Sequence, residues 1–207
     1  MEKLKIIDKW SDVTLAQYLQ IIDMANEEGD EIEKDVRIIS VLYGLDEKSI
    51  WDMSVEEVNK IKSSLAFISM PPKGDKKKYT TLKLGDEKYN VCTDLNKFSY
   101  AQYVDFQTYY KKENNIVEVL SVIVVPDGKK YGEYDIEEVR EKLKALDVQT
   151  AVGICTFFFN CLTELVRNTL KYLEQKMKMM KTLTKGEKKK ELQKIEAQMQ
   201  AMKVIIG

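Results

Sequence analysis

The apolar positions of this chain follow a helical rhythm over its first two thirds. Apolar residues recur at intervals of three and four, and helix-starting and helix-ending residues divide the pattern into segments. The pattern predicts six helices, at about 15–26, 33–43, 55–69, 100–112, 115–125 and 136–146. The prolines at 71 and 72 separate the first three helices from the last three, which gives two groups.

The second group of helices repeats the first. Three segments recur in the same order, namely 14–18 as 99–103, 36–42 as 117–123 and 54–58 as 135–139. A capping-box pattern, in which the N-cap side chain and the third helical residue bind each other's backbone N–H, recurs as well. It occurs as Thr14 with Gln17, Ser99 with Gln102, Ser54 with Glu57 and Asp135 with Glu138. We interpret this as duplication of a three-helix unit; the alternative is two unrelated helical stretches with ordinary start signals.

A different pattern separates the two groups. Residues 73–78 are rich in lysine and indicate an exposed linker, and alternating residues then predict strands at about 79–84 and 88–92 around a turn at Gly85-Asp86. A lone hairpin is marginal in water, so it must lie on the helices or pair with another chain. Its exposed edge could receive a partner strand, although covering the core is the simpler interpretation.

The last part of the chain predicts two long helices. We expect them to fold back as an antiparallel pair around residues 183–186, or to project as an arm. Their apolar seam follows the three-four spacing of coiled coils. It comprises Leu162, Val166, Thr169, Leu173, Met177, Met180, Leu192, Ile195, Met199 and Met202.

These patterns predict a mainly α protein in four regions. They are helical repeat unit 1 (1–70), a linker with a β-hairpin (71–94), helical repeat unit 2 (95–146) and a C-terminal helical hairpin arm (147–207). Residues 1–70 carry 15 acidic and 8 basic side chains, a net charge of −7, whereas residues 171–203 carry 4 acidic side chains and 10 lysines, a net charge of +6. The acidic front and the basic tail can attract each other or a neighbouring subunit.

The sequence offers little for catalysis. It contains no histidine, which removes the commonest general base and metal ligand, and no glycine-rich phosphate loop. Its three cysteines and its carboxylates lack the spacing of a zinc or calcium site. We therefore expect no enzyme, no cofactor, no metal and no catalytic residue. An enzyme working through lysines and carboxylates would require a polar cleft between the two units.

Protein contact is the expected role. Tyr100 and Tyr103 belong to an aromatic stripe, which is typical of core or protein interface, with a stacking platform for bases as the alternative. Methionines suit adaptable interfaces, so Met177, Met180, Leu192, Met199 and Met202 are candidate contacts in the tail. A solvated lysine-rich hairpin, or an arm that contacts nucleic acid without specificity, are the alternatives there.

No apolar run approaches the roughly 20 residues that span a bilayer, and the N-terminus lacks the apolar stretch of a secretory signal. We therefore expect no membrane contact and an intracellular setting.

The helix starts also resemble those of a phage family. The segments 10–18 and 94–105 carry an "acid-Leu…Thr/Ser-x-x-Gln-Tyr" pattern that is similar to tail-assembly-chaperone-like proteins and virion proteins of crAss-like phages. The resemblance covers roughly residues 5–160. It implies a non-enzymatic assembly chaperone or packaged virion protein that contacts other phage proteins and self-associates in many copies, in the virion or the host-cell cytoplasm. A nucleic-acid-associated protein that uses the lysine-rich arm is the alternative.

Overall fold

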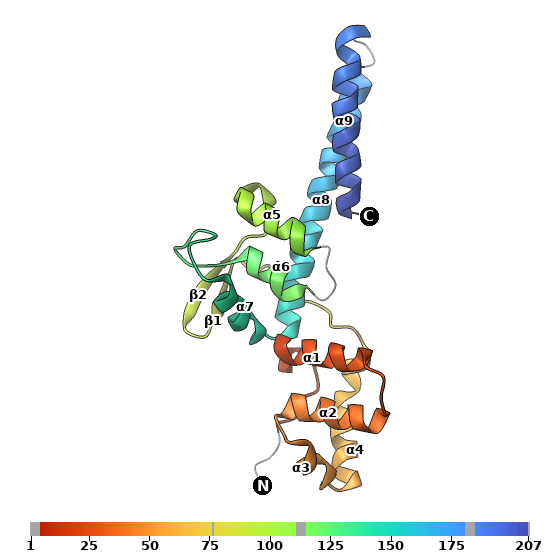
Figure 1. The fold of residues 1–207 in the computed structure, drawn as a ribbon, viewed down its shortest axis with the longest axis vertical. Helices are drawn as coiled ribbons and strands as arrows, with labels where there is room; N and C mark the ends of the chain where they lie inside the picture. Colours follow the sequence, from red (N-terminus) through yellow and green to blue (C-terminus); the bar gives the residue numbers. More distant parts are fainter. Residues whose placement is uncertain (1–4, 76, 111–114, 181–184, 207) are drawn as a thin grey trace. The chain divides into compact units, whose positions relative to one another are not determined.

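The computed structural model describes residues 5–75, 77–110, 115–180 and 185–206; side chains are not described for 179–180, 185–190 and 203–206. It is 67% helical with a small antiparallel sheet, which confirms the predicted mainly α class. Figure 1 shows the elements along the chain. The chain divides into two compact units, one of residues 1–92 and 96–156 and one of residues 93–95 and 157–207.

Repeat 1 (residues 1–70) is built of helices with short connections. The Asp30 side chain caps α2, and Gly44 ends α2 in the left-handed conformation with φ of 64°. The described elements are η1 (Trp10–Asp12), α1 (Leu15–Asn26), α2 (Glu31–Tyr43), α3 (Glu47–Trp51), α4 (Val55–Ser64) and η2 (Leu65–Ser69). The short α3 was not predicted from the sequence.

Repeat 2 (residues 95–146) keeps the helices matched to α1, α2 and α4. Turns stand at the positions matched to α3, and a strand stands at the positions matched to residues 43–45. Its described elements are η3 (Leu95–Lys97), α5 (Tyr100–Tyr109), α6 (Ile116–Ile123), β3 (Val124–Pro126) and α7 (Ile136–Lys144). The sequence predicted that the middle helix reaches residue 125, but α6 ends at Ile123 because the next residues pair in a sheet.

A matched pair of glutamines supports the duplication in space. The side-chain amide of Gln17 donates to the backbone carbonyls of Val41 at 3.0 Å and Leu42 at 3.1 Å. The amide of Gln102 donates to the carbonyl of Val122 at 3.0 Å. Val41 and Val122 are themselves matched positions. Each glutamine therefore closes its capping box and also ties the start of the first helix to the end of the second.

The predicted capping boxes form at three of the four helix starts. Both reciprocal hydrogen bonds are present at the starts of α1, α4 and α5. The prediction for α7 is wrong, because Asp135 accepts from the backbone N–H of Glu137 and the Glu138 carboxylate binds Lys142 at 2.7 Å instead. The ion pair with Lys142 competes for the carboxylate that the box would need.

The predicted hairpin gains a third strand from its own chain. Strands β1 (Thr81–Leu84) and β2 (Glu87–Val91) pair antiparallel around Gly85, whose φ is 62°. Strand β2 also pairs antiparallel with β3, so the order is β1-β2-β3. The hairpin is therefore anchored at the end of α6, which answers the instability of an isolated hairpin.

The linker after repeat 1 is not fully exposed, contrary to the sequence prediction. Gly74 and Asp75 are half-buried against the start of α8 (Val148–Met180). A Cβ on Gly74 would lie 2.5 Å from the Cα of Gly153, which is why neither position has room for a side chain. The Tyr79 hydroxyl donates to the Asp75 carboxylate at 2.5 Å. Gly153, the one helix breaker predicted in this region, is thus a docking site for the backbone of the linker.

The two repeats meet where α7 passes into α8. Leu15 donates its backbone N–H to the carbonyl of Leu146 at 2.7 Å, and Val148 donates to the carbonyl of Val13 at 2.9 Å. Val148 is fully buried in the core of repeat 1. The boundary of the first compact unit consequently falls inside α8, after residue 156, and not at the start of that helix.

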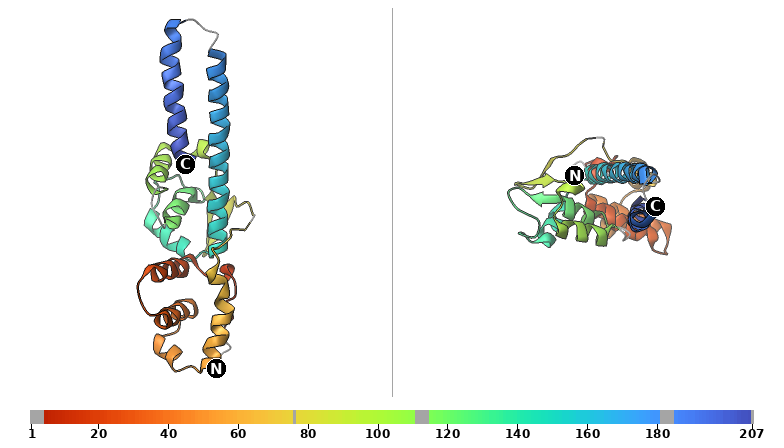
Figure 2. Two further views of the ribbon diagram at one scale, coloured as in Figure 1. Left: turned by 90° about the vertical axis from the view of Figure 1, so that its right-hand side faces the viewer. Right: turned by 90° about the horizontal axis from the view of Figure 1, so that it is seen from above.

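In the second unit, α8 continues and α9 (Lys185–Ile206) runs back beside it, as Figure 2 shows. Leu173 and Ile195 form the buried centre of this pair, and Lys176 binds Glu191 at 3.0 Å. The antiparallel helical hairpin predicted from the apolar seam is present.

The length of α8 bears on the expectation of no membrane contact, which stays a prediction. By length and composition alone its residues Val148–Lys178 could cross a membrane, with a mean hydropathy of 1.3 in the most apolar window. The core helix of a soluble protein passes the same test. The buried residues Val148, Ala151 and Ile154 on its first turns belong to the packed interior of the first unit.

Candidate functional site

An exposed apolar stripe lies on α5. Tyr100 is 82% exposed, and Tyr103 and Val104 are each 42% exposed. Their spacing of three and four places them on one face of the helix. The matched residue of Tyr100 in repeat 1 is Leu15, which is fully buried. The structure thus brings the predicted contacts Tyr100 and Tyr103 to the surface and adds Val104, which sequence reasoning missed.

The predicted contacts in the tail lie mostly inside the hairpin. Met177, Met199 and Met202 pack against the buried pair of Leu173 and Ile195, and Leu192 is half-buried. The side chain of Met180 lies outside the described residues. These residues hold α8 against α9, and a role in binding a partner stays a prediction.

Two exposed residues on α8 were missed. Leu165 is 36% exposed and Tyr172 is 59% exposed, seven positions apart and therefore on one helix face. The sequence shows this spacing of seven, but the apolar seam beside it gives a stronger periodic signal.

Repeat 1 contains an open pocket of about 990 Å³. Its walls come from the N-terminal segment, the start of α1, the end of α2, the turn after α3 and one face of α4. The apolar part comprises Ile7, Leu42, Leu45, Met53 and Ile61. No sequence motif predicts this pocket, because it depends on how several separated segments diverge in space.

The rim of the pocket is polar and charged. Lys5 lies 4.0 Å from the Asp12 carboxylate, and the Tyr43 hydroxyl accepts from the backbone N–H of Ile7 at 3.4 Å. The Ser54 hydroxyl and backbone N–H bind the Glu57 carboxylate, which lowers the pKa of Glu57. The Glu57 carboxylate therefore stays ionised to a lower pH than an ordinary glutamate while it caps α4.

In repeat 2 the positions that match the pocket of repeat 1 form a groove that is filled by a strand. Strand β2 lies between the end of α6 and α7, because Cys92 donates to the carbonyl of Ile123 at 2.8 Å and Lys142 binds Glu87 at 2.9 Å. Tyr89 is only 1% exposed there. Burial beside Tyr89 raises the pKa of Tyr134 to about 12.

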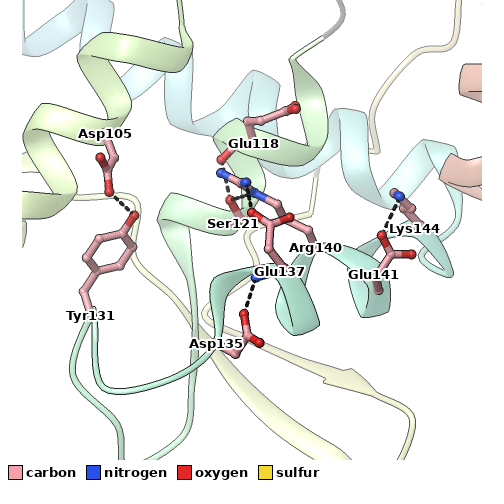
Figure 3. Close-up of polar contacts among 9 residues, drawn as sticks. All are labelled: Asp105, Glu118, Ser121, Tyr131, Asp135, Glu137, Arg140, Glu141 and Lys144. Atoms are coloured by element: carbon pink, nitrogen blue, oxygen red, sulfur yellow. Dashed lines mark hydrogen bonds and ion pairs between the residues drawn. The ribbon is translucent and has the colours of Figure 1, made fainter.

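A half-buried arginine joins α6 to α7 in repeat 2 (Figure 3). The Nε of Arg140 donates to the Ser121 hydroxyl at 3.2 Å, its guanidinium pairs with Glu137, and it lies 5.0 Å from the centre of the Tyr109 ring. The side chain is 15% exposed. Arg140 is one of three arginines in the chain and is used to hold the fold.

The described side chains show no group of three or more histidine, cysteine, aspartate or glutamate residues arranged to hold a metal ion. Burial raises the pKa of the Cys155 thiol to about 12, which keeps it protonated and unreactive. The surfaces described above are suited to binding by shape and apolar contact.

Comparison with known proteins adds no relative. No protein-family model, curated protein or solved structure matches the chain.

Proposed function

We propose that this chain is a non-enzymatic protein–protein interaction component of a tailed phage, either a structural virion protein or a tail-assembly chaperone. The phage assignment rests on the resemblance of the helix starts at 10–18 and 94–105. On this proposal the protein acts in the virion or the host-cell cytoplasm and contacts other phage proteins and further copies of itself.

The exposed stripe on α5 is the observation that carries the proposal of protein contact. Tyr100, Tyr103 and Val104 place two aromatic rings and an aliphatic side chain on one exposed helix face. Contiguous exposed apolar residues mark interaction sites in soluble proteins, and tyrosine is enriched in them. The matched stretch of repeat 1 starts at buried Leu15, so the helix start itself does not require exposure.

Gel filtration with light scattering tests the proposal on the full chain. We expect self-association, or capture of the products of neighbouring genes, that is lost in the double variant Tyr100→Ser/Val104→Ser. Ile32→Ser is the matched control, since Ile32 is also exposed, at 61%, but lies on α2. A strict monomer that binds no phage protein, or a double variant that behaves as the wild type, contradicts the proposal.

A nucleic-acid function for the arm is the second candidate. It is favoured by the 10 lysines and 4 acids of residues 171–203. Against it, Arg140 pairs with Glu137 and Arg37 binds Glu27, so two of the three arginines are engaged. DNA or RNA retention with steep salt dependence that is lost on truncation after Lys171 would establish this function in place of the first.

A further inference from the structure

We propose that the open pocket of repeat 1 binds an extended segment of a partner protein, which seats a large apolar side chain between Met53 and Ile61. This site is separate from the α5 stripe and does not depend on it. The argument comes from the second repeat, where the chain itself shows what such a groove accepts.

The two grooves are built from matched positions. Leu42, Met53 and Ile61 line the pocket of repeat 1. Their counterparts 81 positions later are Ile123, Tyr134 and Lys142. In repeat 2 an extended strand lies across these counterparts, and its central side chain, Tyr89, is buried there.

The mode of binding differs between the repeats in one respect. In repeat 2 the strand pairs with β3, but in repeat 1 the matched backbone already makes hydrogen bonds within the repeat. The backbone N–H groups of Gly44 and Leu45 donate to the Ser40 carbonyl, and the Ser40 hydroxyl donates to the Leu45 carbonyl. Strand pairing is therefore closed to a ligand of repeat 1. Insertion of side chains into the apolar pocket must supply the binding energy.

The size and charge of the site define the ligand. A pocket of about 990 Å³ lies at the upper end of the range for small-molecule sites and exceeds what one side chain fills. Several residues of an extended segment, as β2 supplies in repeat 2, match it better. The charged residues that line the pocket are the acids Asp12, Asp52 and Glu57 and the lysines Lys5 and Lys60, so a basic residue beside the apolar anchor is favoured.

The competing occupant is the N-terminal segment of the chain itself. Residues 2–6 stand 85 positions before β2, which puts Leu4 in register with Tyr89. Residues 2–4 lie outside the described residues, and Lys5 and Ile7 line the edge of the pocket. Ile7 is 6% exposed and its backbone N–H donates to the Tyr43 hydroxyl, so the described part of this segment is held at the edge of the pocket. The Leu4→Ser variant below distinguishes the two occupants.

Fluorescence anisotropy with the full chain tests the proposal. The probe is a fluorescein-labelled peptide of residues 86–92 that carries Glu87→Lys and Cys92→Ser. We expect saturable binding that weakens roughly tenfold or more in the pocket-filling variant Met53→Trp, as for loss of one buried anchor. The probe with Tyr89→Ser should weaken to a similar extent. Ile61→Lys, which installs the residue of repeat 2, is the second pocket variant if Met53→Trp unfolds.

Matched controls separate the outcomes. Ile32→Ser and the α5 double variant should keep full probe binding, so failure of the α5 proposal and failure of this one are distinguishable. No saturable binding up to about 1 mM, or equal binding by wild type and the pocket variants, overturns the proposal. Binding that appears only after Leu4→Ser also overturns it and assigns the pocket to the N-terminal segment.

Discussion

Repeat 1 and repeat 2 share their helix starts but differ in what is covered. In repeat 1 the start of the first helix is buried, with Leu15 fully enclosed, and the groove at the end of the second helix is open. In repeat 2 the helix start is exposed at Tyr100 and the groove is filled by Tyr89. Each repeat covers the surface that the other exposes. The duplicated unit therefore offers two kinds of contact surface, and the neighbouring chain segments decide which one stays accessible.

The largest effect should come from emptying the filled groove. Tyr89→Ala removes a fully enclosed ring and should lower the free energy of unfolding by about 3–5 kcal/mol. Met53→Ala, at the half-buried wall of the open pocket, should cost about 1 kcal/mol. Denaturant unfolding of both variants measures the difference. Equal costs would show that the two grooves are packed alike.

The next effect concerns the matched helix starts. Leu15→Ala should cost about 2–5 kcal/mol because it leaves a cavity where a fully buried side chain was packed. Tyr100→Ala should change stability by less than about 0.5 kcal/mol, since its side chain is largely in solvent. Thermal unfolding of the pair tests this. A strongly destabilised Tyr100→Ala variant would mean that the α5 stripe is part of the core.

The loss of stability on replacing each of the two matched glutamines should follow how deeply that glutamine is buried. Gln102 is 6% exposed, so Gln102→Leu leaves the Val122 carbonyl buried without its donor and should cost about 1–3 kcal/mol. Gln17 is half-buried, and water can replace its amide, so Gln17→Leu should cost about 1 kcal/mol less. Urea midpoints of the two variants decide this order, and the reverse order would refute it.

The smallest effect is one of pH. Hydrogen bonds from Ser54 lower the pKa of Glu57 in the folded state, so the carboxylate stabilises the fold above the ordinary glutamate pKa, near pH 4.3. That contribution is lost as pH falls through the lowered folded pKa. Ser54→Ala should remove this part of the acid sensitivity, and Ser99→Ala serves as control because Gln102 does not titrate. Parallel pH profiles for wild type and Ser54→Ala would contradict the assignment.

Signals between residues close together in the chain determined much of the architecture. The capping pairs Thr14–Gln17 and Ser99–Gln102 located two helix starts to the residue, because a cap depends only on neighbours within one turn. The apolar seam predicted the α8–α9 pair in the same way, since its period is a property of the helix itself. The exposure of Tyr100 was not determined by these signals, because the same helix start is buried in repeat 1.

What the tertiary structure decided depends on contacts between distant segments. The third strand, the docking of the linker at Gly153 and the open pocket each join residues far apart in the chain. The local pattern around Val124 predicts helix. In the structure these residues are extended, because pairing with β2 satisfies their backbone groups in that form. The sequence alone located most of the helices, since their hydrogen bonds are local; the short α3 and the end of α6 are the exceptions. Which faces stay open was decided by the three-dimensional packing of distant segments, which no local pattern records.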